Sequence, residues 1–266
     1  LAVIVTLLSK GLSYPLIIGG LAMGGAVGFV AAKRVQMTGM PELVALFNGF
    51  GGLASLLVGL AEYYRGKISN NLLESVLIEE LSSFTATVIV LTILIGGITF
   101  TGSIYAWGKL SGKLGGRALT FTGQKAFNAL LALGIIAAGI LFSSSPATEL
   151  AHAVLIAVLI LSLLLGIFAV MPIGGGDMPV VISLLNSCSG LAACAAGFVI
   201  NNNVLVVAGC LVGASGLILT VIMCKAMNRT LINVLVSGFG ANTQANGAKS
   251  KGCLLYTSPS PRDLST

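Results

Sequence analysis

The polar residues with the clearest chemical potential lie within residues 174–229. This segment begins with the acidic, glycine-rich stretch GGGDMPV, which contains Asp177, and ends in the basic stretch CKAMNR. Between them runs an apolar sequence interrupted by Asn186, Ser187 and Ser189. A carboxylate can bind and release a proton, and amides and hydroxyls can hydrogen-bond to water. Inside an apolar run, such groups are typical of a proton path or of a binding site for a polar solute.

The segments that position these residues have the composition of a membrane protein. Hydrophobic residues make up 56% of the chain and charged residues only 8%, with a mean hydropathy of +1.03. About a quarter of the residues in an average soluble protein are charged. Several apolar runs reach the roughly 20 residues that cross the hydrocarbon core as a helix. We therefore predict an all-α fold, a polytopic transmembrane helix bundle. The predicted full spans cover residues 13–32, 42–61, 84–106, 126–142, 150–171, 178–200 and 203–224.

The distribution of basic residues predicts the orientation of these spans. If the spans alternate, one side of the membrane receives only Lys10, Arg65 and Lys67. The other side receives Lys33, Arg34, Lys109, Lys113, Arg117, Lys125, Lys225 and Arg229. Because short cytoplasmic loops carry an excess of Lys and Arg, the basic loops are predicted to face cytoplasm or mitochondrial matrix. The net charge of +6 therefore needs no nucleic-acid partner to explain it.

Small and polar residues form two predicted helix faces near the end of the bundle. Spacings of three and four place one set on a single face of residues 178–200, namely Ser183, Asn186, Gly190, Ala193 and Gly197. The same spacing on residues 203–224 groups Gly209, Gly213, Gly216 and Thr220. Small faces let membrane helices approach closely, so these faces can be packing seams and nothing more.

Asn186 and Ser215 are predicted to lie at a similar depth, roughly 12 Å from the basic side. A polar group without a partner in hydrocarbon costs several kcal/mol, so these side chains should face each other, water or a neighbouring helix. They can carry a hydrogen-bonded water file with Asp177 as its titratable entry. The alternative is an interhelical hydrogen bond worth about 1 kcal/mol.

Other polar features predict no site. The cysteines within or at the ends of apolar runs form no CxxC pair and are interpreted as packing residues, so no metal site is predicted; they are Cys188, Cys194, Cys210 and Cys224. His152 is interpreted as an interfacial histidine, with a proton relay as the alternative. Residues 62–83 form either an amphipathic interfacial helix or a solvated connector. The basic, glycine-rich residues 107–125 are predicted to meet anionic lipid or a partner domain, with phosphate binding as the alternative.

Long stretches of the chain resemble one known family. GGGDMPVVISLLNSCSGLAACAAGF and VAGCLVGASGLILTVIMCKAMNRTLINVLVSGFG are similar to the membrane domain of the beta subunit of proton-translocating NAD(P) transhydrogenase. AKRVQMTGMPELVALFNGFGGLASLLVG and GGITFTGSIYAWGKLSGK resemble the same family, in the same order. The resemblance covers about residues 13–240 and implies a membrane domain that couples hydride transfer between NAD(H) and NADP(H) to proton translocation.

The resemblance also implies roles for particular residues. Asn186 resembles the family's mid-membrane asparagine on the proton path, and Asp177 resembles its acidic residue at the mouth. Ser183 and Ser215 join them in the expected proton path. Lys225 and Arg229 resemble the basic exit towards the NADP(H)-binding domain, and with Gly213 and Gly216 they form the expected coupling hinge. No catalytic, cofactor-binding or metal-binding residue is expected in this chain itself.

The apolar runs and the resemblance together divide the chain into four parts. Residues 1–12 are expected to be a truncated transmembrane span and turn, and residues 13–229 the helix bundle. Residues 230–252 are expected to be a linker towards a missing NADP(H)-binding domain. Residues 253–266, CLLYTSPSPRDLST, are unlike the family and are interpreted as a non-native read-through tail; the alternative is a genuine disordered terminus.

The expected partners are membrane lipid, the NAD(H)- and NADP(H)-binding domains of the same enzyme, and a second copy in a homodimer. The expected location is the mitochondrial inner membrane in a eukaryote and the plasma membrane in a bacterium. Two other functions stay open from the residues alone. A secondary transporter or channel uses mid-membrane polar groups of the same kind, and a purely structural membrane subunit would use the small-residue faces only to dock helices.

Overall fold

The computed structural model describes residues 14–36, 39–72, 83–144, 149–228 and 230–231, and these are helical apart from their connections. The helices are α2 (Tyr14–Arg34), α3 (Met40–Leu72), α4 (Ser83–Leu110), α5 (Gln124–Ser144), α6 (Glu149–Val170), the short 3-10 helix η2 (Gly175–Asp177), α7 (Met178–Val199) and α8 (Asn203–Ala226). Seven helices in these ranges are long and apolar enough to cross a membrane. The predicted all-α fold and its seven full spans are confirmed.

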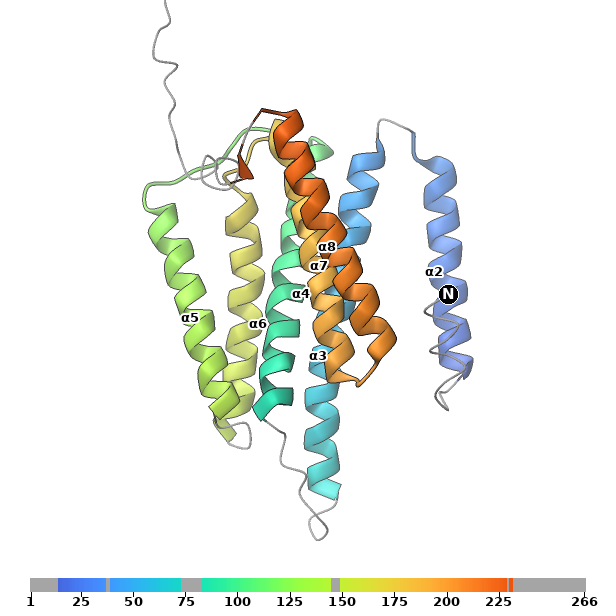
Figure 1. The fold of residues 1–266 in the computed structure, drawn as a ribbon, viewed down its shortest axis with the longest axis vertical. Coiled ribbons are helices and arrows are strands. Elements are labelled where there is room, and N and C mark those ends of the chain that lie inside the picture. The colour runs from blue at the N-terminus through green and yellow to red at the C-terminus, as the bar shows by residue number, and fades with distance from the viewer. Residues whose placement is uncertain (1–13, 37–38, 73–82, 145–148, 229, 232–266) are drawn as a thin grey trace, which may run out of the picture.

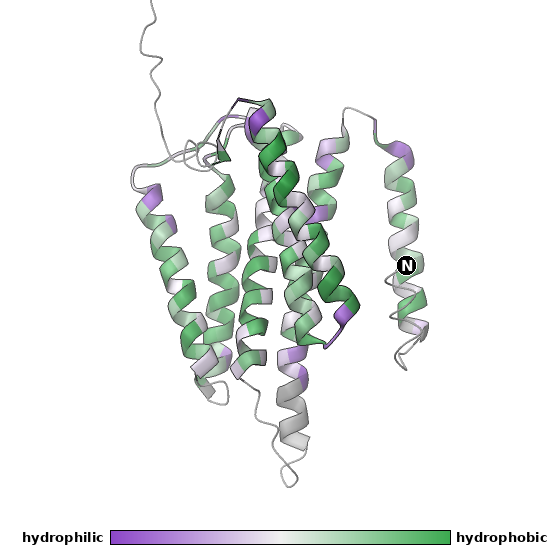
Figure 2. Cartoon of the chain, viewed as in Figure 1, coloured by the Kyte–Doolittle hydropathy of each residue, from purple (hydrophilic) through white to green (hydrophobic). Residues whose placement is uncertain are grey.

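The long helices run side by side, so their connections gather at two ends (Figure 1). α2, α4, α6 and α8 finish at one end, where α3, α5 and α7 begin. We call this the basic end, because the connections and helix termini there carry the described residues Lys33, Arg34, Lys109, Lys113, Arg117, Lys125 and Lys225. Figure 2 shows apolar residues along most of each helix and polar residues concentrated towards the ends.

α3 is longer than its predicted span. It continues through residues 62–72 as one helix, so this part of the predicted connector extends α3 beyond the apolar run. Arg65 donates a hydrogen bond to Glu62 one turn away, in a pairing typical of an exposed helix surface. Residues 73–82 lie outside the described residues, as do residues 1–13 and 232–266, which include the predicted truncated span and the predicted tail.

α4 is the central helix and packs against α3, α5, α6 and α7. Glycines allow its closest approaches. A Cβ at Gly96 in α4 would lie 2.8 Å from the carbonyl oxygen of Gly52 in α3, and a Cβ at Gly52 would lie 2.9 Å from the carbonyl oxygen of Gly96. Neither position can hold a larger residue without moving backbone. Close backbone approach through small residues is the usual basis of helix association in membranes.

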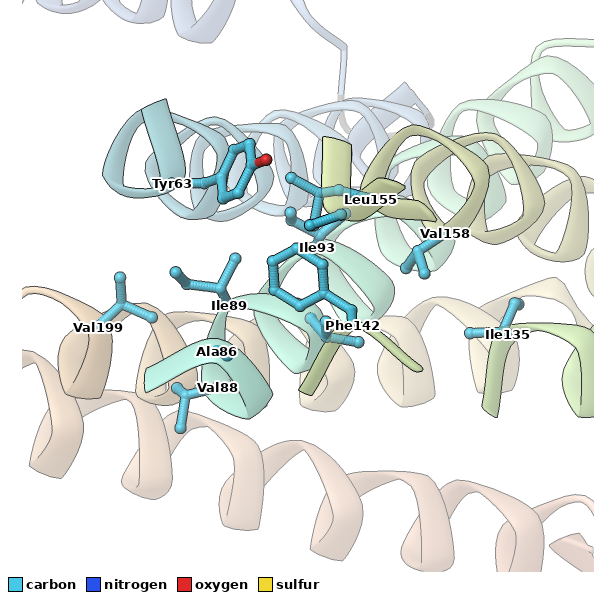
Figure 3. Close-up of a cluster of buried hydrophobic side chains, with 12 residues drawn as sticks. Tyr63, Ala86, Val88, Ile89, Ile93, Ile135, Phe142, Leu155, Val158 and Val199 are labelled. Carbon is cyan, nitrogen blue, oxygen red and sulfur yellow. The ribbon is translucent and has the colours of Figure 1, made fainter. Parts of the chain in front are cut away.

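Buried apolar side chains fill the space between these helices. Figure 3 shows one cluster, in which Tyr63 of α3, Ile93 of α4 and Phe142 of α5 lie with Leu155 of α6. A second cluster lies nearer the basic end, around Ala45, Ala106, Val170, Met178 and Leu185. α2, by contrast, stands apart from the other described helices (Figure 1), and its side chains are largely exposed.

Candidate functional site

The candidate site begins where α7 enters the bundle from the basic end. The backbone N–H of Gly175 donates a 2.9 Å hydrogen bond to the carbonyl oxygen of Gly116, so the α6–α7 and α4–α5 connections touch. Asp177 occupies the N-cap position of α7 and is half-buried. A carboxylate at this position interacts favourably with the positive end of the helix dipole. Asp177 therefore lies at the mouth of the polar helix, as the sequence predicts.

Lys109 fixes this entry from the neighbouring helix. Its side chain is only 3% exposed, and its Nζ donates hydrogen bonds to the carbonyl oxygens of Met171 and Ile173, the latter at 2.7 Å. These carbonyls follow the end of α6, where intrahelical partners run out. Lys109 therefore joins the end of α4 to the connection that leads into Asp177. In the sequence, Lys109 is recognisable only as one of the basic residues on its side of the membrane, so this role is visible only in the structure.

The seam between α7 and α8 is built from serines and glycines. Ser187 Oγ donates a 2.6 Å hydrogen bond to the carbonyl oxygen of Gly213. Ser183 Oγ donates to the carbonyl oxygen of Gly216 at 3.3 Å and accepts a hydrogen bond from Thr220 at 3.1 Å. These polar groups satisfy one another between the helices, so Ser183 is part of the seam and has partners other than water.

The glycines of the seam bring the two backbones together. A Cβ at Gly190 would lie 2.9 Å from the carbonyl oxygen of Gly209, and one at Gly216 would lie 2.8 Å from the backbone nitrogen of Ser187. Gly213 and Gly216 therefore contact α7 in the middle of α8, which is continuous from Asn203 to Ala226. The predicted face of α8 is confirmed as a packing face.

The predicted face of α7 is wrong at the level of its asparagine. The polar contact with α8 at that level is made by Ser187 and not by Asn186, and Cys194 lies against Gly209 further along. The contact residues of α7 follow spacings of four and three, as in a coiled coil; they are Ser183, Ser187, Gly190, Cys194 and Gly197. Because adjacent helical residues are rotated by roughly 100°, Asn186 points away from the centre of this seam.

Asn186 is half-buried, and its side chain makes no hydrogen bond within the described residues. The side of α7 next to it faces α3, since a Cβ at Gly51 in α3 would lie 3.1 Å from Ser189 Oγ. α3 and α7 both run inward from the basic end (Figure 1). Asn48 precedes Gly51 by three residues and Asn186 precedes Ser189 by three, so the two asparagines lie at a similar depth.

Asn48 is itself part of a buried polar pair. Its Nδ2 donates a 2.9 Å hydrogen bond to Ser103 Oγ of α4, and the side chains are 9% and 1% exposed. Asn48 is not among the site residues predicted from the sequence. The signal is present in the chain, because Asn48 interrupts the apolar run 42–61 as Asn186 interrupts its own run. Asn48, Ser103 and Asn186, from three different helices, thus lie at one level of the bundle.

Ser215 does not join this group. It is exposed on α8, and its Oγ donates a 2.9 Å hydrogen bond to the carbonyl oxygen of Val212 in its own helix. Two residues at the same depth therefore need not be in contact. Gly216, the residue after Ser215, faces α7, and the rotation between adjacent helical residues turns Ser215 away from α7. The hydrogen bond to its own backbone satisfies the hydroxyl without a partner helix.

The basic exit and the remaining titratable residues lie away from the asparagines. Lys225 is exposed in the last turn of α8, and Arg229 lies outside the described residues. His152 stacks on Tyr63 with ring centroids 6.3 Å apart, towards the opposite end, and its buried Nδ1 makes no hydrogen bond with the part of the chain that the structure describes. Within the described ranges, no group of three His, Cys, Asp or Glu residues is arranged to hold a metal ion.

Seven membrane-length helices around a buried polar level define an integral membrane protein. The family model for the NAD(P) transhydrogenase beta subunit matches residues 1–260. The NAD(P) transhydrogenase subunit beta of Rhodospirillum rubrum is 43% identical over 247 residues, which cover 91% of this chain and 50% of the relative. The protein of the same name from a specified strain of that species gives the same values. The chain belongs to the NAD(P) transhydrogenase beta subunit family and spans about half the length of the curated relatives it matches.

Proposed function

We propose that this chain is the proton-conducting membrane domain of an NAD(P) transhydrogenase, in which hydride transfer between NAD(H) and NADP(H) is coupled to proton translocation. The observation that carries the proposal is the placement of Asn186. It is half-buried in a membrane-length helix, makes no side-chain hydrogen bond within the described residues, and lies level with the Asn48–Ser103 pair. A polar group in such a place needs water or a proton carrier as its partner.

The polar groups form a sequence from the basic end inward. Asp177 can exchange a proton at the mouth of α7, and Asn186 follows roughly 13 Å further along the helix. An amide does not titrate near neutral pH, but it donates and accepts hydrogen bonds and can orient a file of water. Ser183, one turn before Asn186, holds α8 against α7 beside this path. Asn48 and Ser103 border the path from α3 and α4.

Nucleotide binding belongs, in this proposal, to domains outside the described residues. The cavity between α4 and α5 is lined mainly by aliphatic side chains, including Val90, Leu94 and Ile136, and by no basic residue. It does not fit a dinucleotide, whose pyrophosphate requires backbone N–H groups or basic side chains. Residues 230–252 would lead to the NADP(H)-binding domain, and the NAD(H)-binding domain would be a further partner.

The coupling hinge is proposed at the C-terminal end of α8. Lys225 and Arg229 would respond to the nucleotide domain, because Lys225 lies in the last turn of the helix that packs against α7 and Arg229 follows that helix in the sequence. Gly213 and Gly216 would transmit the movement, since their contacts with α7 leave no space for a shift of α8 alone. Because the seam is rigid, a displacement of α8 would also move α7 and therefore Asn186.

The basic end is proposed to face the cytoplasm of a bacterium or the matrix of a mitochondrion, as the excess of Lys and Arg there favours. The complete enzyme would lie in the plasma membrane or the mitochondrial inner membrane accordingly. It would be surrounded by lipid and assembled as a homodimer with its nucleotide-binding domains.

Reconstitution tests this function. The full-length parent of this chain, purified with its partner domains, is placed in proteoliposomes, where hydride transfer and internal pH are followed together. We expect acidification that requires both nucleotides, and hydride transfer that accelerates when an uncoupler collapses the proton gradient. Proton or solute flux without nucleotides would instead indicate a transporter or channel. Hydride transfer without any proton movement would indicate that the chain is a purely structural subunit.

A further inference from the structure

Two cysteines meet across the α7·α8 seam. Sγ of Cys194 in α7 lies 3.2 Å from Sγ of Cys210 in α8, and both are free thiols. Cys194 is 8% exposed, whereas Cys210 is exposed on the outer side of α8. The pair therefore has one sheltered thiol and one that a small reagent can reach from the surface of the bundle.

The glycines beside the pair explain the close contact. A Cβ at Gly209 would lie 2.7 Å from the carbonyl oxygen of Gly190 and 2.8 Å from Cα of Cys194. The backbones of α7 and α8 are thus nearly touching where Cys210 follows Gly209. Disulfides require Cα atoms about 4.4–6.8 Å apart, and only helices with so close an approach bring two side chains of this length together without a large movement of backbone.

We propose that Cys194 and Cys210 form an oxidisable pair that closes to a disulfide within the membrane. Hydrogen peroxide, a small neutral oxidant, converts the exposed Cys210 thiol to a sulfenic acid and releases one water. The Cys194 sulfur then attacks the Cys210 sulfur, the S–S bond forms, and the hydroxyl leaves as a second water with the Cys194 proton. The two thiols lose two electrons in total, and the peroxide accepts them.

The disulfide would lock the seam at a defined place. The link lies about two helical turns from the Asn201–Asn202 turn, on the side where Gly190 packs against Gly209 and Gly213. It would fix both the separation of α7 and α8 and the rotation of one about the other. Oxidation would therefore stabilise the bundle and, if coupling works through this seam as proposed above, slow the coupled reaction.

The test uses membranes that contain the full-length parent protein and its partners. They are exposed to hydrogen peroxide, free thiols are blocked with an alkylating reagent, and peptides are mapped by mass spectrometry with and without dithiothreitol. We expect a peptide pair linked through Cys194 and Cys210 that disappears on reduction, and an unfolding midpoint several degrees higher in the oxidised protein. Cys210→Ala should abolish both changes, while Cys224→Ala, which removes a buried thiol elsewhere on α8, should leave them.

Three results would overturn the proposal. One is the absence of the linked peptide under peroxide and under copper–phenanthroline, with Cys210 alkylated in full. Another is a link from Cys210 to a cysteine of a second copy, seen as a covalent dimer. The third is an unchanged unfolding midpoint in fully linked protein. A linked, stabilised protein with unchanged turnover would support the cysteine pair and count against coupling through the α7·α8 seam.

Discussion

The hydroxyl of Ser187 donates a hydrogen bond to the carbonyl oxygen of Gly213, at the level of the bundle where the side chain of the neighbouring Asn186 makes none with any described residue. Two consecutive polar residues on one helix thus have different partners. Ser187 is satisfied by α8 and holds the seam together. Asn186 lies to the side of the seam, one turn before Ser189, which lies against Gly51 of α3.

Ser187→Ala should weaken the seam without abolishing function. Interhelical hydrogen bonds in membranes contribute about 0.6 kcal/mol on average and up to roughly 1.7 kcal/mol. We expect a loss in this range, measured by thermal unfolding of the detergent-solubilised enzyme, with transhydrogenation largely retained. Ser215→Ala is the matched control, because the hydroxyl of Ser215 donates its hydrogen bond to Val212 of its own helix. A loss of activity in Ser187→Ala at unchanged stability would contradict a purely structural role.

Gly190→Ala should disrupt the seam more severely. The added Cβ would lie 2.9 Å from both the carbonyl oxygen of Gly209 and Cα of Gly213, and backbone cannot rotate aside as a side chain can. Overpacking of this kind costs about 1–3 kcal/mol or more, so we expect a lower unfolding midpoint and reduced assembly. Gly24→Ala on α2 is the control, since no other helix in the described part of the chain comes within 4 Å of its Cβ position. Equal stability of the two variants would refute the close packing.

Asn186→Leu should slow the coupled reaction as a whole. The leucine keeps the apolar packing but cannot hydrogen-bond to water, so we expect proton pumping and hydride transfer to fall together by at least about tenfold. Acidification of proteoliposomes and reduction of a nucleotide analogue measure the two rates. Ser215→Val removes a hydroxyl at similar depth from the exposed face of α8 and should have little effect. Normal pumping by Asn186→Leu would exclude the proposed path.

Asn48→Leu should affect the same process as Asn186→Leu. We expect reduced pumping from the single change, and a double variant little worse than the more damaged single one, because residues of one network are not additive. Ser103→Ala tests whether the partner of Asn48 contributes. Fully additive losses in the double variant would mean that the two asparagines act independently.

Lys109→Met should loosen the entry to α7. The change leaves the carbonyl oxygens of Met171 and Ile173 without their charged donor. A hydrogen bond to a charged group contributes about 1.5–3 kcal/mol, so we expect a loss of about 2 kcal/mol in thermal unfolding and faster proteolysis of the α6–α7 connection. Lys125→Met, at an exposed residue of the same end, is the control. An unfolding midpoint equal to that of the control would show that the buried Lys109 is dispensable.

Much of the architecture follows from the chain alone. Apolar runs such as 84–106 are long because the thickness of the bilayer sets the length of a spanning helix. Their length therefore identifies them as membrane spans from the sequence alone. The basic residues flank these runs, so their collection at one end follows from alternation of the spans. The position of Asp177 at the start of α7 follows from the sequence as well, because the glycine-rich stretch that contains it directly precedes the apolar run 178–200.

The contacts between helices could not be predicted from the sequence in the same way. The sequence determined which residues are polar, how deep each lies and which family the chain resembles. Only the tertiary structure decided that Ser187 faces α8, that Ser215 faces outward, and that Asn48 on α3 shares a level with Asn186. The physical reason is rotation: a step of one residue turns a side chain by roughly 100°. The crossing of two packed helices selects which of two adjacent polar residues becomes the contact, and that crossing depends on glycines far apart in the chain.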